Sequence, residues 1–140
     1  MPASTAAKFN QFVEDKANGV HNLGTGALTV ALTSVAPVAG NSVLADLTQI
    51  AYTNCSSRVL TTTSSAQTAG LYKLILADLT LTASGGAIAG FRYVVIYNDT
   101  PTSPADPLIV WLDYGSALTV ADGESLLIDM SAVNGILQDT

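Results

Sequence analysis

The sequence predicts a mainly β protein, an antiparallel β-sandwich or barrel-like domain with a short N-terminal helix and one further short helix. Two observations lead to this class. Apolar residues recur with a period of two in several short runs separated by Gly, Pro, Asn, Asp and Ser turn signals. Only two stretches show helical spacing instead. The 140 residues fit a single domain, 1–140, in which we expect 1–19 to be an N-terminal helical segment.

The first predicted element is a helix over 6–18. Ser4 or Thr5 can cap its N-terminus, and Asn18 and Gly19 supply a C-terminal stop. Three apolar side chains fall on one face of this helix: Phe9, Phe12 and Val13.

Next, residues 27–34 (ALTVALTS) alternate between apolar and small polar side chains, which predicts a half-buried strand. Residues 42–50 place apolar side chains at helical spacing and predict the second short helix, with Ser42 as a possible cap. The Thr- and Ser-rich stretch 51–70 reads as a loop with one short strand around 58–62.

The longest strand candidate is 71–82 (LYKLILADLTLT). Its alternation is imperfect, which indicates either burial on both faces or a bulge near Ala77 and Asp78. Residues 125–130 predict another strand, and VNGIL at 133–137 predicts a last turn with a short apolar tail that can pair as an edge strand.

Between these lie the two strands of a hairpin, 87–98 and 107–115. If Tyr97 pairs with Leu108, opposed residues sum to 205, and Arg92 then faces Asp113. A register shifted by one would set Arg92 against an apolar residue. We therefore predict Arg92 and Asp113 to be a structural pair that marks the hairpin register.

The hairpin loop, 98–107 (NDTPTSPADP), is longer than the usual two to five residues. Asn98, Asp99, Thr102 and Asp106 could supply oxygen atoms to a cation such as Ca²⁺. The same residues are ordinary turn formers, and three prolines stiffen the segment. We prefer the interpretation that this long loop projects onto a neighbouring subunit through these four side chains.

Composition restricts the function classes. Charged residues are only 11% of the chain, against about 25% in an average domain, and residues 93–140 contain seven acidic residues with no Lys or Arg. A nucleic-acid partner needs a clustered basic surface, so it is not expected. No membrane span or signal peptide is recognisable. A surface rich in Ser and Thr suits extensive protein contact, because burying a hydroxyl costs less than burying an ion.

Catalytic chemistry is not predicted. His21 is the only histidine, and a lone His after a helix stop is more often a capping or packing residue than a catalyst. Cys55 is the only cysteine, which excludes an internal disulfide and a cysteine-cluster metal site. No nucleophile elbow, phosphate-binding glycine loop or HExxH motif occurs. We expect no enzyme activity, no cofactor and no bound metal.

Four segments carry a family resemblance: KFNQFVEDKANGVHNLGTGALTVALTSVAPVAGNSVLADLTQI, TTTSSAQTAGLYKLILADLTLTASGG, FRYVVIYNDT and DYGSALTVADGESLLIDMSAVNGIL. In this order they resemble a family of small virion structural proteins of tailed bacteriophages, most closely the head decoration, or capsid cement, proteins. The resemblance implies a protein made in the bacterial host cytoplasm and located on the capsid exterior in the virion. The implied partners are the major capsid protein and copies of itself, as a homo-trimer.

Two alternatives stay open from the sequence. One is a tail or fibre component that contacts the host or another tail protein. The other is a calcium-dependent or carbohydrate-binding module that uses the 98–107 loop. The sequence also allows two roles for Phe9 and Phe12. Their side chains pack against a neighbouring subunit, or they close the domain's own core.

Overall fold

A computed structural model describes residues 6–130 and 136–139. It is mainly β, with antiparallel sheets, as the sequence predicts. The largest sheet has four strands in the order β1-β7-β6-β2, a second has the order β3-β4-β9, and a third pairs β5 with β8. The strand bounds are β1 Ala7–Lys8, β2 Leu28–Thr33, β3 Thr62–Thr68, β4 Leu71–Leu76, β5 Leu79–Thr82, β6 Ile88–Asn98, β7 Leu108–Val120, β8 Ser125–Ile128 and β9 Leu137–Asp139.

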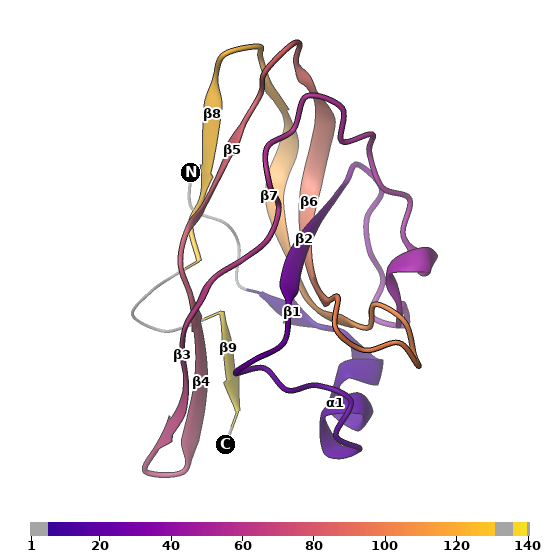
Figure 1. Ribbon diagram of the computed structural model, residues 1–140. Coiled ribbons are helices and arrows are strands. Elements are labelled where there is room, and N and C mark those ends of the chain that lie inside the picture. Colours follow the sequence, from indigo (N-terminus) through magenta and orange to yellow (C-terminus); the bar gives the residue numbers. More distant parts are fainter. Residues whose placement is uncertain (1–5, 131–135, 140) are drawn as a thin grey trace.

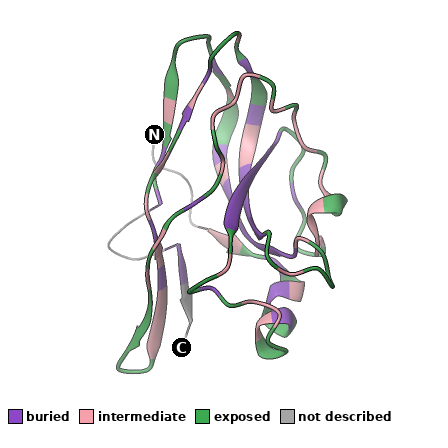
Figure 2. Ribbon diagram, in the orientation of Figure 1, coloured by how far each residue is buried: buried purple, intermediate pink, exposed green. Residues whose placement is uncertain are grey.

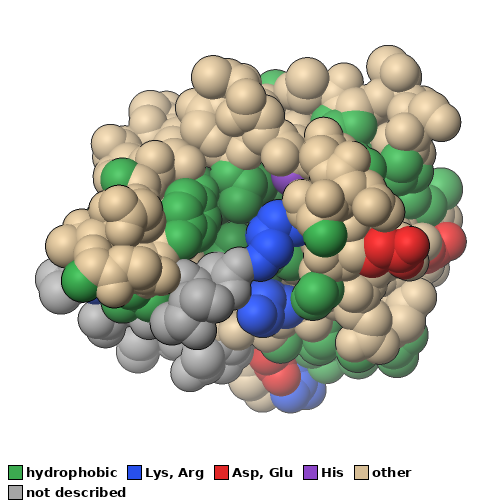
Figure 3. Space-filling model, turned by 90° about the horizontal axis from the view of Figure 1, so that it is seen from below, with side chains coloured by type: hydrophobic (Ala, Val, Ile, Leu, Met, Phe, Trp, Pro, Cys, Tyr) green, Lys and Arg blue, Asp and Glu red, His purple; other side chains and the backbone are tan. Residues whose placement is uncertain are grey.

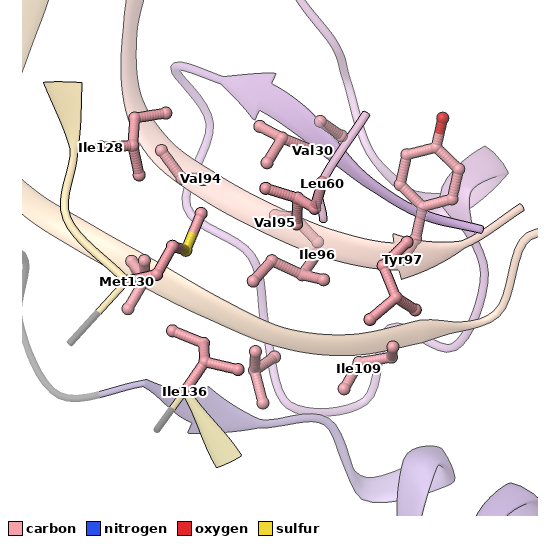
Figure 4. Packing of buried hydrophobic residues seen from close by; sticks show 14 of the residues in the cluster. Val30, Leu60, Val94, Val95, Ile96, Tyr97, Ile109, Ile128, Met130 and Ile136 are labelled. Atoms are coloured by element: carbon pink, nitrogen blue, oxygen red, sulfur yellow. The ribbon is translucent and has the colours of Figure 1, made fainter. Parts of the chain in front are cut away.

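The sheets form two layers in a sandwich-like arrangement (Figure 1). The four-stranded sheet is one layer, and the two smaller sheets form the other; the described strands do not close into a barrel. Side chains from both layers meet in one apolar core, in which Ile128, Met130 and Ile136 join the side chains of β6 from Val94 to Tyr97 (Figure 4).

The strand β2 is buried on both faces, whereas the sequence pattern predicts burial of one face only. The reason is the segment that follows it. The Leu32 N–H donates to the hydroxyl of Tyr52, and the Thr33 hydroxyl donates to the carbonyl of Thr48. These bonds hold residues 48–52 against the strand, so its threonines are covered as well as its aliphatic side chains.

The helix α1 (Asn10–Ala17) is shorter than predicted. The chain is extended before it, because residues 7–8 pair with β7, and Phe9 occupies the N-cap position without a side-chain hydrogen bond. The predicted caps Ser4 and Thr5 lie outside the described residues. The C-terminal stop is as predicted: Asn18 is the C-cap, and Gly19 takes a positive φ of 76°.

The second predicted helix is only a 3₁₀ turn, η1 (Leu44–Asp46). A carboxylate oxygen of Asp46 accepts bonds from the backbone N–H groups of Ser42 and Val43. These bonds also lower the pKa of Asp46. They close a single turn, after which Leu47 returns to extended geometry.

The predicted long strand 71–82 breaks into β4 and β5 at Ala77 and Asp78, where the sequence indicates a change of register. Asp78 accepts a hydrogen bond from the Met130 N–H (2.8 Å) instead of continuing a ladder. The short strand predicted around 58–62 is wrong, since regular pairing with β4 begins at Thr62 and runs to Thr68. The strand β9 includes Leu137 and pairs with β4 at the sheet edge; residues 133–135 of the predicted turn lie outside the described residues.

Candidate interaction surfaces

Arg92 and Asp113 form an ion pair with two contacts. Arg92 Nε lies 2.8 Å from Asp113 Oδ1, and Nη2 lies 3.1 Å from Oδ2. Asp113 also accepts the Gly115 N–H at 2.7 Å. The bond from Arg92 is the main cause that lowers the pKa of Asp113, and the Gly115 N–H adds to it. Both side chains are partly exposed, so the pair organises the hairpin surface and offers no enclosed site.

The register of the hairpin agrees with the prediction only at its loop end. Tyr97 pairs with Leu108, but Ile96 then pairs with Val110, and Asp113 lies opposite Tyr93 instead of Arg92. The extra residue is Ile109, whose carbonyl accepts the Phe9 N–H (3.1 Å). This bulge shifts the pairing by one residue. Arg92 lies in a second irregularity, between the Phe91–Leu118 and Tyr93–Asp113 pairs, and from there its guanidinium reaches Asp113.

Asn98 is not available to a partner or to a cation. It is fully buried, and its N–H donates to the Pro107 carbonyl across the base of the loop. Its side-chain oxygen accepts the Thr100 N–H, and its amide nitrogen lies 3.3 Å from His21 Nδ1. Its inclusion among the contact residues was therefore wrong, because a buried amide with these partners is part of the fold.

The remainder of the 98–107 loop is anchored along both arms. On one arm, Ala27 donates to the Thr100 hydroxyl and accepts the Asp99 N–H, both at 2.8 Å. On the other, the Leu44 N–H donates to the Asp106 carbonyl at 2.9 Å. The loop lies against its own domain instead of projecting freely. Asp99 and the tip 102–105, which includes Thr102, stay exposed.

The two loop carboxylates interact with each other. Partial burial raises the pKa of Asp106, and a hydrogen bond with Asp99 and the charge of Asp99 raise it further. Two neighbouring carboxyl groups are a weak start for a cation site, which needs several oxygen atoms converging on one point. Within residues 6–130 and 136–139, no three His, Cys, Asp or Glu side chains are grouped to hold a metal.

Phe9 and Phe12 belong to the domain's own core. Phe9 is 0% exposed and Phe12 is 1% exposed. The Phe9 ring centroid lies 4.6 Å from that of Trp111, and the Phe12 ring centroid lies 5.1 Å from that of His21. Their assignment to an intermolecular surface is corrected: β1 and α1 fold back onto β7, so both rings are covered within one chain.

A shallow hollow of about 580 Å³ separates the end of α1 from the β3–β4 hairpin. Its lining includes Lys16, His21, Ser65 and Tyr72. Figure 3 looks onto this end of the molecule, where apolar side chains lie in a recess beside basic ones.

Burial lowers the pKa of His21, although Asp15 opposes the shift. His21 packs on Phe12 and bonds Asn98, which is the structural role that the sequence favours.

Arg58 is a structural residue that the sequence pattern does not reveal. Its guanidinium carbon lies 3.6 Å from the centroid of the Tyr52 ring, and Nη1 donates to the Val30 carbonyl at 2.6 Å. The only available signal is a single basic residue in a Ser- and Thr-rich stretch, six positions after a tyrosine.

Nearby, burial raises the pKa of the Cys55 thiol, which disfavours the nucleophilic thiolate.

Comparison of the chain with protein-family models, with curated proteins and with solved structures found no match. Among the described residues, no helix has both the length and the apolar character needed to cross a membrane.

Proposed function

We propose that this chain is a virion structural protein of a tailed bacteriophage. In this proposal it binds the outer capsid surface and stabilises the contacts between major capsid protein subunits. The order of the four sequence segments that resemble the decoration proteins supports the assignment.

The observation that carries the proposal is a neutral arm, residues 61–70 (TTTSSAQTAG), formed by β3 and its turn into β4. It contains no charged residue, and every residue from 65 to 70 is exposed. The arm extends from the lower end of the sandwich, where the end of β3 and the turn are exposed and the start of β4 is half-buried (Figure 2). A surface of hydroxyl, amide and methyl groups costs less to bury than a charged one when its polar groups find hydrogen-bond partners, so it suits contact with protein.

Stabilisation of a shell by such a protein requires differential affinity and no bond chemistry. Copies that bind the assembled shell, and not its separated subunits, stabilise the shell. The stabilising free energy increases with the logarithm of the ratio of their free concentration to Kd. The neutral arm supplies the main contact in this mechanism. The exposed Asp99 and Thr102 of the 98–107 loop supply a polar rim to this contact. Self-association, as the homo-trimer that the resemblance implies, increases the avidity of the contact.

The test is electron microscopy of virions assembled with and without this protein. The proposal expects regularly spaced density on the outside of the capsid that disappears in its absence, together with earlier loss of packaged DNA on heating. Unchanged capsid density would overturn it, and density that disappears from the tail would replace it with the tail or fibre alternative.

A matched pair of variants tests the role of the arm. Gln67→Glu with Thr68→Glu places two charges on exposed arm positions, and Ala121→Glu with Ser125→Glu places two charges on exposed positions at the β7–β8 turn. The proposal expects the first variant to bind shells at least tenfold more weakly and the second to bind like the unmodified chain. Equal binding by both variants would exclude the arm as the contact.

A further inference from the structure

The strand β3 forms an open edge of the β3-β4-β9 sheet. One side of β3 pairs with β4 from Thr62 to Thr68. Along its other side, within the described part of the chain, the backbone of residues 62–68 has no hydrogen-bond partner. An open strand edge is a template for pairing with another strand.

The edge strands β1, β2, β8 and β9 are covered, short or flanked by charge. Two long strands run beyond their partners: β2 pairs with β6 only at residues 93–98, and β1 pairs with β7 only at residues 110 and 111. The edge strand β2 is covered by residues 58–60, because the Val30 N–H donates to the Arg58 carbonyl and the Leu60 N–H donates to the Leu28 carbonyl, both at 2.9 Å. The strand β1 has two residues and β9 has three. The strand β8 has four residues, between Glu124 and Asp129.

Among the strands that end a described sheet, β3 is the longest. It is seven residues long (TTSSAQT) and contains no charge and no proline, which are the usual means of blocking an edge. A bulge lies only at its beginning, between Thr62 and Ser64. Ser65 to Thr68 are all exposed, and Gly24 lies beside the Ser65 side chain.

We propose that β3 pairs with β3 of a second copy of this chain, antiparallel and about a two-fold axis through Ser65. This is the register that uses the whole strand: residue 62 faces residue 68, and residue 64 faces residue 66. The charge distribution favours a second copy. The chain carries a net charge of −6, which opposes general self-association, but two neutral arms meet without bringing like charges together. The proposal concerns the free protein. Pairing of β3 covers the arm that the proposed function assigns to the capsid, so the dimer and the capsid-bound chain are separate states.

Introducing charges at two facing positions tests the pairing, with sedimentation velocity as the measurement. In Ser64→Glu with Ala66→Glu, each new carboxylate faces another across the axis, while Glu at position 66 also lies opposite Lys73 of its own hairpin. The dimer should dissociate at least tenfold more readily. In Ser64→Lys with Ala66→Glu, opposite charges face each other, and the dimer should be restored. A monomeric unmodified chain at high concentration, or dimerisation unaffected by the double Glu change, would overturn the proposal.

A disulfide tests the register itself. With the native thiol removed by Cys55→Ser, Ser65→Cys places two thiols across the axis at a Cα separation of roughly 4.5–5.5 Å, within disulfide range. The matched control is Thr68→Cys, which faces residue 62 and not itself. We expect oxidation to yield a covalent dimer of the first variant and not of the second. Equal cross-linking of both variants, or a trimer without the 65–65 disulfide, contradicts this pairing.

Discussion

Arg92 and Asp113 form an ion pair with two contacts, although Asp113 lies opposite Tyr93 in the strand ladder. Arg92 lies where the ladder is irregular, because the register shifts between the Phe91–Leu118 and Tyr93–Asp113 pairs. This irregularity interrupts the alternation of faces, and the long Arg92 side chain reaches the carboxylate opposite its neighbour Tyr93. The ion pair is thus compatible with either register and does not by itself fix the pairing of the hairpin.

Replacing Asp113 by Asn should flatten the acid limb of the stability curve. The pKa of Asp113 is lowered in the folded state, first by Arg92 and then by the Gly115 N–H. A carboxyl with a depressed folded pKa contributes stability above its unfolded pKa and loses it as pH falls through the folded value. Urea unfolding at pH 2 to 7 measures this slope. Arg92→Gln should flatten the slope in the same direction, and an unchanged slope in both variants would contradict the argument.

Much of the fold follows from the sequence because alternation and turn signals act locally. The break at Ala77 and Asp78 and the stop at Gly19 are visible in this way. The bulge at Ile109 is not, because residues 94–97 and 108–110 are all apolar and a shift by one residue leaves every pairing apolar. The seven residues of β3 lack periodicity, since both faces are polar, and become a strand only because β4 supplies the ladder.

The candidate site was less predictable, because burial depends on distant segments. Phe9 is covered once β1 pairs with β7, and Asn98 is covered once His21 packs beside it. The loop arms are anchored by residues 27 and 42–44, which lie more than 50 positions earlier in the chain. No local pattern contains these contacts.

Phe12→Ala should destabilise the isolated domain by about 3–5 kcal/mol, because it empties a fully buried aromatic site. Val13→Ala is the matched control: Val13 is the next residue of α1 but is 53% exposed, so its truncation should cost less than about 0.5 kcal/mol. Denaturant unfolding measures both values. A small loss for Phe12→Ala that depends on protein concentration would return Phe12 to an intermolecular surface.

Asp106→Asn should stabilise the protein more at pH 7 than at pH 3. Burial and Asp99 raise the pKa of Asp106, so its contribution to stability is present below the unfolded pKa and is lost as pH rises through the folded value. Asn removes this ionisation and tolerates the positive φ of 50° at this position. Unfolding free energies of both chains at the two pH values measure the difference. The exposed Glu124→Gln supplies a reference. A benefit of Asp106→Asn that is equal at both pH values would show that ionisation of Asp106 does not affect stability.

Arg58→Ala should cost about 2 kcal/mol, because it removes a charged hydrogen bond to the Val30 carbonyl and the contact with the Tyr52 ring. Arg58→Lys should recover part of this loss, since an ammonium group keeps the charge but lacks the planar fork. The exposed Lys8→Ala is a control for loss of a positive charge and should change stability by less than about 0.5 kcal/mol. If Arg58→Ala and Lys8→Ala have equal effects in denaturant unfolding, Arg58 does not anchor the segment 48–60.

His21 should titrate below its ordinary value of about 6.5, because burial disfavours the charged imidazolium. The folded state then binds fewer protons than the unfolded state between the two pKa values. Stability is therefore full above about pH 6.5 and declines as pH falls toward the folded pKa. A two-dimensional NMR titration follows the only histidine directly. Asp15→Asn removes the negative charge that raises the His21 pKa, so this variant should lower the pKa further. A His21 pKa at or above 6.5 in the unmodified chain would contradict the argument, because it would mean that solvent or a carboxylate reaches the buried Nε2.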